Sequence, residues 1–317
     1  PQHWPETMDY TNKRVIIIGS GATAVTLVPA MATQAAHVTM LQRSPTYIVS
    51  LPMQDRVANW LRRWLPARPA HGLIRWKNVL TNMFYYQLMR RWPKVMKSYL
   101  IKQVQEQLGP DYDVTTHFTP HYNPWDERLC LVPDGDLFNA IKTGKASVVT
   151  DHIERFIPTG IQLRSGRELE ADIIIAATGL VMRLMSGVQL IVDGKPVILA
   201  EQMTYKGMML SDVPNLALAI GYTNASWTLK CELIHRYVCR LLNYMGGHGY
   251  VQCTPRQSDS AISAEPVVDF TSGYIQRALP SLPSQGSRRP WKLPQNYLLD
   301  RLACGFSRID DGVMEFK

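Results

Sequence analysis

The sequence predicts an α/β fold in which a strand, a glycine turn, a helix and a second strand open a parallel sheet. Residues 13–19, Lys-Arg-Val-Ile-Ile-Ile-Gly, form a short run rich in β-branched side chains, typical of a buried parallel strand. Residues 20–33 follow with helical apolar spacing, and residues 37–41 form a second apolar run. Such a strand, helix and strand within about 30 residues is a βαβ unit. Pro29 lies inside the expected helix, where it should kink it.

Length and composition favour an ordinary two-domain globular protein. The chain has 317 residues, of which 46% are hydrophobic, so it can bury a sizeable core. Its five scattered cysteines include no CxxC pair, which favours a reducing, cytoplasmic setting without a disulfide framework or a structural zinc. No metal site is expected elsewhere either. No run of about 18 uninterrupted apolar residues predicts a membrane-spanning helix.

The expected organisation is a linker at 1–9, a first domain at 10–183 and a second block at 184–317. Residues 55–108 have helical spacing and form a helical insertion, with breaks expected at Pro66, Pro69 and Pro93. Residues 109–136 are rich in Pro, His and Tyr and predict a long irregular loop.

Short apolar runs predict the remaining elements. Strands are expected at 147–150, 153–157, 161–163, 171–179 and 216–220, and a helix at about 227–244. The run 171–179 reads as another buried strand. The tail after Gly246 is polar and Pro-rich, with few signals of regular structure.

The helical insertion is strongly basic. Between Arg56 and Lys102 there are eleven Lys and Arg residues and no Asp or Glu, in a chain of net charge +8. Four tryptophans are interleaved with them: Trp60, Trp64, Trp76 and Trp92. One interpretation is a set of amphipathic helices that bury their aromatic faces and leave the basic groups in water. The other is peripheral contact with the inner face of the cell membrane. Nucleic acid is not an expected partner.

The most specific local motif follows the first strand: Gly19, Ser20, Gly21, Ala22, Thr23 and Ala24. Gly19 permits a tight turn, Gly21 lets the backbone approach a pyrophosphate, and the small Ala24 allows the helix to pack closely on the strand. A phosphate would then meet the N–H groups and the positive dipole end of the helix. Because the motif lies between a strand and a helix, it predicts a Rossmann-like dinucleotide site.

The end of the second strand selects among dinucleotides. An NAD site usually has an acid there for the ribose hydroxyls, whereas this strand ends Leu41-Gln42-Arg43-Ser44. Arg43 suits a 2′-phosphate, which predicts NADPH as the ligand. The alternative is a solvated arginine beside a purely structural turn. A second, weaker signal is Ala177-Thr178-Gly179, where a glycine after an apolar strand lets backbone pass close to a cofactor.

Longer stretches carry a resemblance to a known family. The chain opens Pro1-Gln2-His3-Trp4-Pro5, which matches the last part of the fingerprint F-x-G-x-x-x-H-x-x-x-W-P. The other matching stretches are GSGATAVTLVPA, HVTMLQRSPTYIVS, HYNPWDERLCLVP, ADIIIAATGL, YKGMMLS and GYTNASWTLK. Together they resemble type I Baeyer–Villiger flavin monooxygenases, in particular the ethionamide-activating FAD-containing kind, along essentially the whole chain.

The resemblance implies a two-dinucleotide-binding flavoprotein: an NADPH domain with a helical insertion, followed by the C-terminal part of an FAD domain. In this family NADPH reduces FAD, and a C4a-peroxyflavin formed with O₂ converts ketones to esters or oxidises sulfides and thioamides. A family arginine beside this chemistry matches Arg128, for which pairing with Asp126 or Glu127 is the alternative interpretation. Better-studied relatives have a phosphate-binding lysine where this chain has Glu127.

The fingerprint histidine would stand just before Pro1, and the 317 residues hold no second glycine motif of this kind. We therefore expect an N-terminally truncated fragment that shows no turnover alone. An inactive remnant or an NADP-binding module without flavin is the alternative. A redox-disulfide flavoprotein reductase would need a closely spaced cysteine pair, which the chain lacks.

Overall fold

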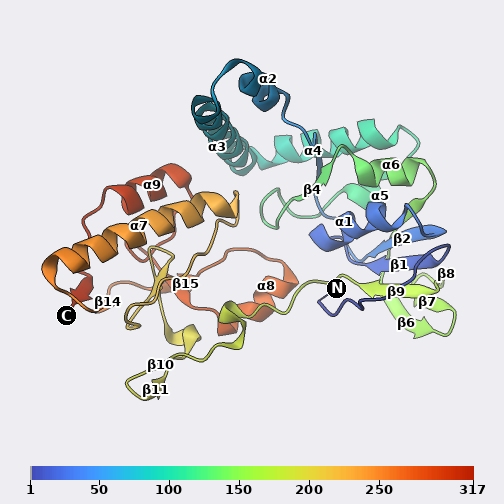
Figure 1. Ribbon diagram of the computed structural model, residues 1–317. Coiled ribbons are helices and arrows are strands. Elements are labelled where there is room, and N and C mark those ends of the chain that lie inside the picture. The colour runs from blue at the N-terminus through green and yellow to red at the C-terminus, as the bar shows by residue number, and fades with distance from the viewer. Residues whose placement is uncertain (1) are drawn as a thin grey trace. The chain divides into compact units, whose positions relative to one another are not determined.

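The computed structural model describes residues 2–317 (Figure 1). The chain consists of two compact units, and the boundary between them in the sequence lies between Leu180 and Val181. Pro1, where the fingerprint match begins, lies outside the described residues.

The first unit is built on a four-stranded parallel sheet in the order β5-β2-β1-β9. Its strands are β1 (Arg14–Ile18), β2 (His37–Gln42), β5 (Ala146–Thr150) and β9 (Ile173–Ala176). Helix α1 (Ala22–Met31) joins β1 to β2, so the predicted βαβ unit is confirmed. The helix continues through Pro29 to Met31. Ile18 is in register with both Leu41 and Ala176, which brings the carboxyl ends of three strands to one edge.

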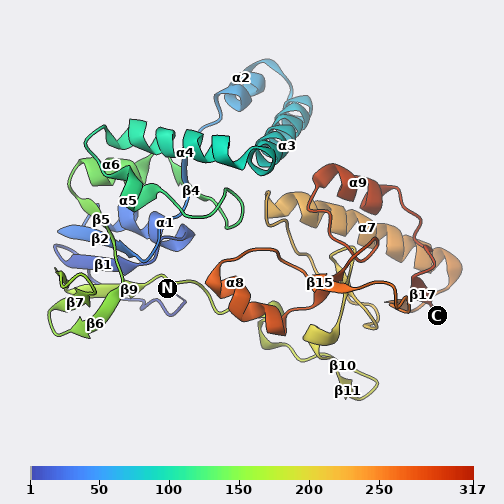
Figure 2. The same cartoon turned by 180° about the vertical axis from the view of Figure 1, so that it is seen from behind.

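Successive side chains of β1 point to opposite faces of this sheet, which explains the layers on either side of it. Val15 and Ile17 point to a core made with α1 and with α4 (Pro93–Leu108), α5 (Val114–Phe118) and α6 (Asp136–Lys142). Ile16 points to the opposite face, which the antiparallel strands β6 (Ile153–Ile157), β7 (Gly160–Leu163) and β8 (Glu168–Glu170) cover. Figures 1 and 2 show the helices on one side of the sheet and β6–β8 on the other.

The predicted helical insertion consists of α2 (Arg56–Trp64), α3 (Ala67–Arg91) and α4. Pro66 precedes α3 and Pro93 begins α4, so the breaks expected at these two prolines are confirmed. The break expected at Pro69 is wrong, because Pro69 lies in the first turn of α3. Amide groups there have no partner within the helix, so a proline costs little.

Two further expectations for the first unit need correction. Residues 109–136 are not wholly irregular: they contain α5 and β4 (Cys130–Pro133), which pairs in parallel with β3 (Ile48–Leu51). Strand β9 is not fully buried, because among the described residues it has a sheet neighbour on one side only. Ile175 is buried, whereas Ile174 is 38% exposed.

The second unit is organised around α7 (Trp227–His248), against which α9 (Tyr297–Gly305) packs. The helix predicted at 227–244 is thus confirmed and runs one turn longer. Its other elements are α8 (Gly273–Ala278) and the short strands β10 (Ile191–Val192), β11 (Lys195–Pro196), β12 (Thr204–Tyr205), β13 (Met209–Leu210), β14 (Cys253–Pro255), β15 (Ala264–Pro266), β16 (Ser284–Gly286) and β17 (Met314–Phe316). The polar tail after Gly246 therefore has more regular structure than predicted.

The strand predicted at 216–220 does not form among the described residues. The segment pairs with no strand, although the Leu218 amide donates a hydrogen bond of 2.6 Å to the carbonyl oxygen of Met208. Apolar character made the segment suitable for a sheet, but a strand also requires a partner. No helix of the described residues is long and apolar enough to cross a membrane.

Candidate functional site

The carboxyl edge of the parallel sheet collects most of the residues that the sequence singles out. The glycine turn follows β1, residues 42–44 end or follow β2, and residues 177–179 follow β9. Because these strands are parallel and in register, the three segments lie at one edge. Ligands of open α/β sheets bind at such an edge, beyond the carboxyl ends of the strands.

Gly19 packs directly against the segment that follows β9. Its φ is +134°, and a Cβ atom at this position would lie 2.4 Å from the carbonyl oxygen of Ala177. Backbone bonds hold the two segments in place: the Gly19 amide donates to Leu41 and the Ala177 amide donates to Ile18, both at 2.8 Å. A side chain at Gly19 would therefore break the turn.

Gly21 differs from Gly19, because it faces open space. Its φ of −79° is ordinary, and a Cβ atom there would meet no atom within 4 Å. Gly21 precedes α1, which has no side-chain cap and no acid in its first turn, formed by Ala22, Thr23 and Ala24. Ala24 is fully buried against the sheet. The positive end of α1 is thus open to an anionic group, as a phosphate requires.

The residues at the end of β2 differ in whether their side chains are exposed or buried. Arg43 is exposed, and among the described residues no ion pair or hydrogen bond engages its guanidinium. Beside it, the carbonyl oxygen of Ser44 accepts a hydrogen bond of 3.0 Å from Ser20 Oγ, which ties the glycine turn to this loop. Gln42 is only 2% exposed and its side chain is engaged inside the protein.

Gln42 holds the loop after α5 to β5. Its Nε2 donates to the carbonyl oxygen of His117 at 2.7 Å and to Thr150 Oγ1 at 2.8 Å. His117 Nδ1 lies 2.9 Å from the same hydroxyl. Burial lowers the pKa of His117 below its usual 6.5, so the imidazole is neutral at pH 7. Sequence patterns do not reveal this cluster, because its members are 33 or more residues apart and share no local motif.

Arg128 lies in a loop that is fixed next to the glycine turn. The guanidinium is exposed, and two residues later the Cys130 thiol lies 3.9 Å from the carbonyl oxygen of Ser20. Asp126, one of the acids considered as a partner for Arg128, pairs with Arg90 at 3.1 Å. The Tyr47 hydroxyl donates to the carbonyl oxygen of Tyr122 at 2.6 Å and anchors the start of the loop.

Cys130 itself is not suited to nucleophilic chemistry. Burial raises the pKa of its thiol to about 11, so the group remains protonated at neutral pH. Arg128, in contrast, gives this loop a permanent positive charge.

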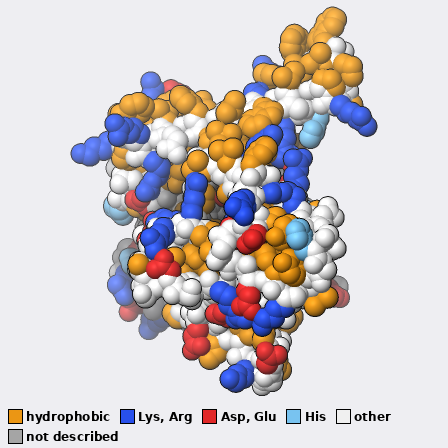
Figure 3. Space-filling view, turned by 90° about the vertical axis from the view of Figure 1, so that its left-hand side faces the viewer, with side chains coloured by type: hydrophobic (Ala, Val, Ile, Leu, Met, Phe, Trp, Pro, Cys, Tyr) orange, Lys and Arg blue, Asp and Glu red, His pale blue; other side chains and the backbone are white. Residues whose placement is uncertain are grey.

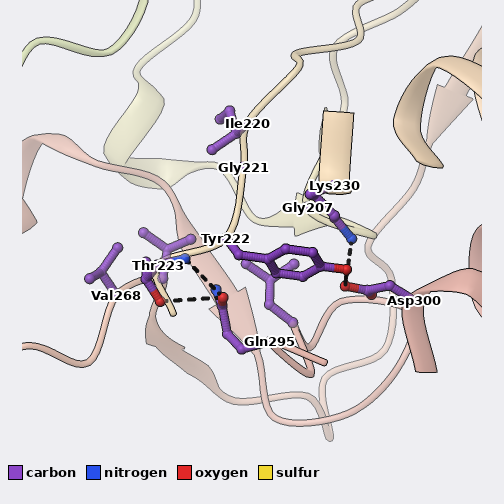
Figure 4. Close-up of a pocket in the computed structure, with 11 residues that line it drawn as sticks. Gly207, Ile220, Gly221, Tyr222, Thr223, Lys230, Val268, Gln295 and Asp300 are labelled. Carbon is purple, nitrogen blue, oxygen red and sulfur yellow. Dashed lines mark hydrogen bonds and ion pairs between the residues drawn. The ribbon is translucent and has the colours of Figure 1, made fainter. Parts of the chain in front are cut away.

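The second unit contains a separate pocket, shown in Figure 4. Lys230 and Asp300 are each about 5% exposed, and Lys230 Nζ lies 3.1 Å from Asp300 Oδ2 without the alignment of a hydrogen bond. The Tyr222 hydroxyl donates to the same Oδ2 at 2.7 Å. Residues 220–223, which precede the predicted helix, form one wall. Lys230 and Asp300 were missed, since 70 residues separate them.

Gly221 in that wall is required by packing. A Cβ atom there would lie 2.2–2.5 Å from atoms of Trp227, the first residue of α7. The turn therefore fits tightly onto the start of the helix, which has neither a side-chain cap nor an acid in its first turn.

Comparison with known proteins identifies relatives along the whole chain. It is 55% identical over 317 residues to the FAD-containing monooxygenase EthA of Mycobacterium tuberculosis, and 51% identical over 318 residues to the probable FAD-binding monooxygenase AlmA of Acinetobacter baylyi. These alignments cover 100% of this chain but 65% and 64% of the two relatives. The chain thus spans about two thirds of the length of the relatives it matches. No family model matches.

Solved structures show the same architecture at low sequence identity. An oxidised steroid monooxygenase bound to NADP matches with a TM-score of 0.68 at 20% identity, over 99% of this chain and 68% of that one. OTEMO in complex with FAD and NADP matches with a TM-score of 0.64 at 17% identity and the same coverage. These matches confirm the predicted α/β fold class.

Proposed function

Because this chain is homologous over its whole length to FAD-containing monooxygenases, we propose that it forms the NADPH-binding part and the C-terminal part of an NADPH- and O₂-dependent flavin monooxygenase. The observation that carries the proposal is the open space at Gly21, before an uncapped helix, within a chain 55% identical to such an enzyme. Proposed substrates are ketones, oxidised to esters, and sulfides or thioamides, oxidised at sulfur. We assign residues 10–183 to an NADPH domain and 184–317 to an FAD domain.

NADPH would lie at the carboxyl edge of the parallel sheet. Its pyrophosphate fits the space in front of Gly21, where the amides at the start of α1 would donate to it. Arg43 would pair with the 2′-phosphate, and it is free to do so because no acid of the described chain engages it. The backbone of residues 177–179 would border the nicotinamide half of NADPH. Gly179, with φ +113°, would permit the cofactor to approach this backbone closely.

FAD, when bound, would supply the activation of O₂ that amino-acid side chains cannot provide. The residues that fit it in the second unit are the turn at 221–227 and the uncapped start of α7, whose positive end would stabilise negative charge on a flavin. Arg128 would supply a permanent positive charge for oxygen atoms that become anionic.

The test uses the enzyme that carries this chain, mixed with NADPH without oxygen and then exposed to O₂ and a ketone or sulfide. A flavin monooxygenase should lose flavin absorbance in the first step and form ester or sulfoxide in the second. NADPH binding without O₂ consumption would instead support the alternative, an NADP-binding module.

A further inference from the structure

Helices α2 and α3 expose an unusual number of large apolar side chains. They are Val57, Trp60, Trp64, Leu73, Leu80 and Phe84, named here the α2–α3 surface. Trp64 is 73% exposed and Phe84 is 61% exposed. Within each helix these positions recur at spacings of three, four or seven residues, so they share one side of the helix. Figure 1 draws α2 at the top of the molecule, and Figure 3 shows the molecule turned about its vertical axis. At the top of Figure 3, hydrophobic side chains gather next to Lys and Arg side chains.

Helices α2 and α3 also have a buried core between them. Ala58, Ala70 and Ile74 are buried between the two helices, and Leu61 and Leu65 pack against them. Asp55 caps α2 by accepting a hydrogen bond of 3.0 Å from the Ala58 amide. It also pairs with Lys77 of α3. The inner faces of the two helices are thus buried against each other. Trp60 and Trp64 belong to a second apolar side, which is exposed in the described chain.

The charge around this surface is predominantly positive. Arg56, Arg62, Arg63 and Arg68 are exposed on or next to α2, and no acid occurs between Arg56 and Lys102. A partner that covers the surface must therefore bury apolar and aromatic groups and also carry negative charge. An anionic bilayer offers both, because tryptophan favours the headgroup level and basic side chains are attracted to anionic lipids.

We propose that the α2–α3 surface docks on an anionic phospholipid bilayer, with the two helices lying in the plane of the interface. Such interfacial helices bury one apolar side among the headgroups and keep their basic groups at the lipid phosphates. In this arrangement neither helix crosses the membrane. Membrane docking by this surface uses no property of the dinucleotide site, so its failure would leave the proposed function unaffected.

The experiment is co-sedimentation of the protein with phosphatidylcholine vesicles, with and without phosphatidylglycerol. The unmodified protein should pellet with the anionic vesicles, less with the neutral ones, and less as salt increases. The double variants Trp60→Ala/Trp64→Ala and Arg62→Glu/Arg63→Glu should each lose most of this binding. Strand β6 supplies matched controls, Phe156→Ala and Arg155→Glu, since Phe156 is 62% exposed and Arg155 is also exposed. Both control variants should bind like the unmodified protein.

Two outcomes would overturn the proposal. One is binding to anionic vesicles that survives both double variants, which would place the contact elsewhere. The other is failure to bind vesicles, combined with self-association that the Trp60→Ala/Trp64→Ala variant abolishes, which would make the surface an interface between copies. Circular dichroism of each variant verifies that the helices are retained.

Discussion

The carbonyl oxygen of Ala177 occupies the place where a side chain on Gly19 would have to stand. The distance from that oxygen to a Cβ atom built on Gly19 is 2.4 Å, whereas a Cβ atom on Gly21, two residues later, meets nothing within 4 Å. The first glycine of the motif is thus required by the protein itself. The second faces open space and is not required by packing within the protein.

The two glycines should therefore respond differently to alanine. Gly19→Ala places a non-glycine residue at an unfavourable φ and creates a clash with the backbone. It should lower the free energy of unfolding by about 1–3 kcal/mol. Gly21→Ala should cost less than about 1 kcal/mol of stability yet weaken NADPH binding roughly tenfold or more, about 1.4 kcal/mol. Urea unfolding and calorimetric titration measure the two effects. A stable Gly21→Ala variant with unchanged NADPH affinity would contradict the phosphate assignment.

Arg43 should distinguish NADPH from NADH. Arg43→Ala removes the proposed partner of the 2′-phosphate and should weaken NADPH binding by about 1.5–3 kcal/mol, with NADH nearly unaffected. Arg155→Ala, at an exposed position on β6, is the matched control and should leave both affinities unchanged. Equal losses for the two nucleotides would show that Arg43 contacts something other than the 2′-phosphate.

His117 should make stability fall at acid pH. Its pKa in the folded protein lies below 6.5 because the ring is partly buried. As the pH falls below 6.5, the unfolded chain takes up the proton before the folded protein does, so the free energy of unfolding decreases. Above pH 6.5 both states are neutral and the penalty disappears. His117→Gln should flatten this dependence in urea unfolding measured across the range, and an unchanged slope would assign the effect to other groups.

Arg128→Ala separates the two halves of the proposed reaction. In the enzyme that carries this chain, NADPH should still reduce the flavin at a rate close to that of the unmodified enzyme, because Arg128 is not assigned to hydride transfer. Oxygen insertion into a ketone should be lost, since the positive charge beside the reacting oxygen is gone. Stopped-flow absorbance and product analysis measure the two steps. Normal ester formation would remove Arg128 from the proposed role.

The elements that the sequence predicts well are those whose signals are local. The β-branched run before Gly19 and the small residues after it specify strand, turn and helix without help from distant segments. The same holds for the start of α7 at Trp227 and for Pro66 and Pro93 at the helix ends. Each of these features depends on steric preferences of a few consecutive residues.

The features that sequence patterns missed depend on contacts between distant segments. Residues 216–220 have the composition of a strand, but pairing decides whether a strand forms. Gln42 looks like one more polar residue at a strand end, yet its amide is used on His117, 75 residues away. The Lys230–Asp300 pair likewise joins two helices that only folding brings together.

Oxygen transfer to a substrate can be measured directly. The enzyme that carries this chain is given unlabelled NADPH, a ketone and isotopically labelled O₂, and the product is analysed by mass spectrometry. A flavin monooxygenase should give an ester containing one labelled oxygen atom, formed with NADPH and far less with NADH. Consumption of NADPH without label in the product, or no consumption of O₂, would contradict the assignment of this chain to a flavin monooxygenase.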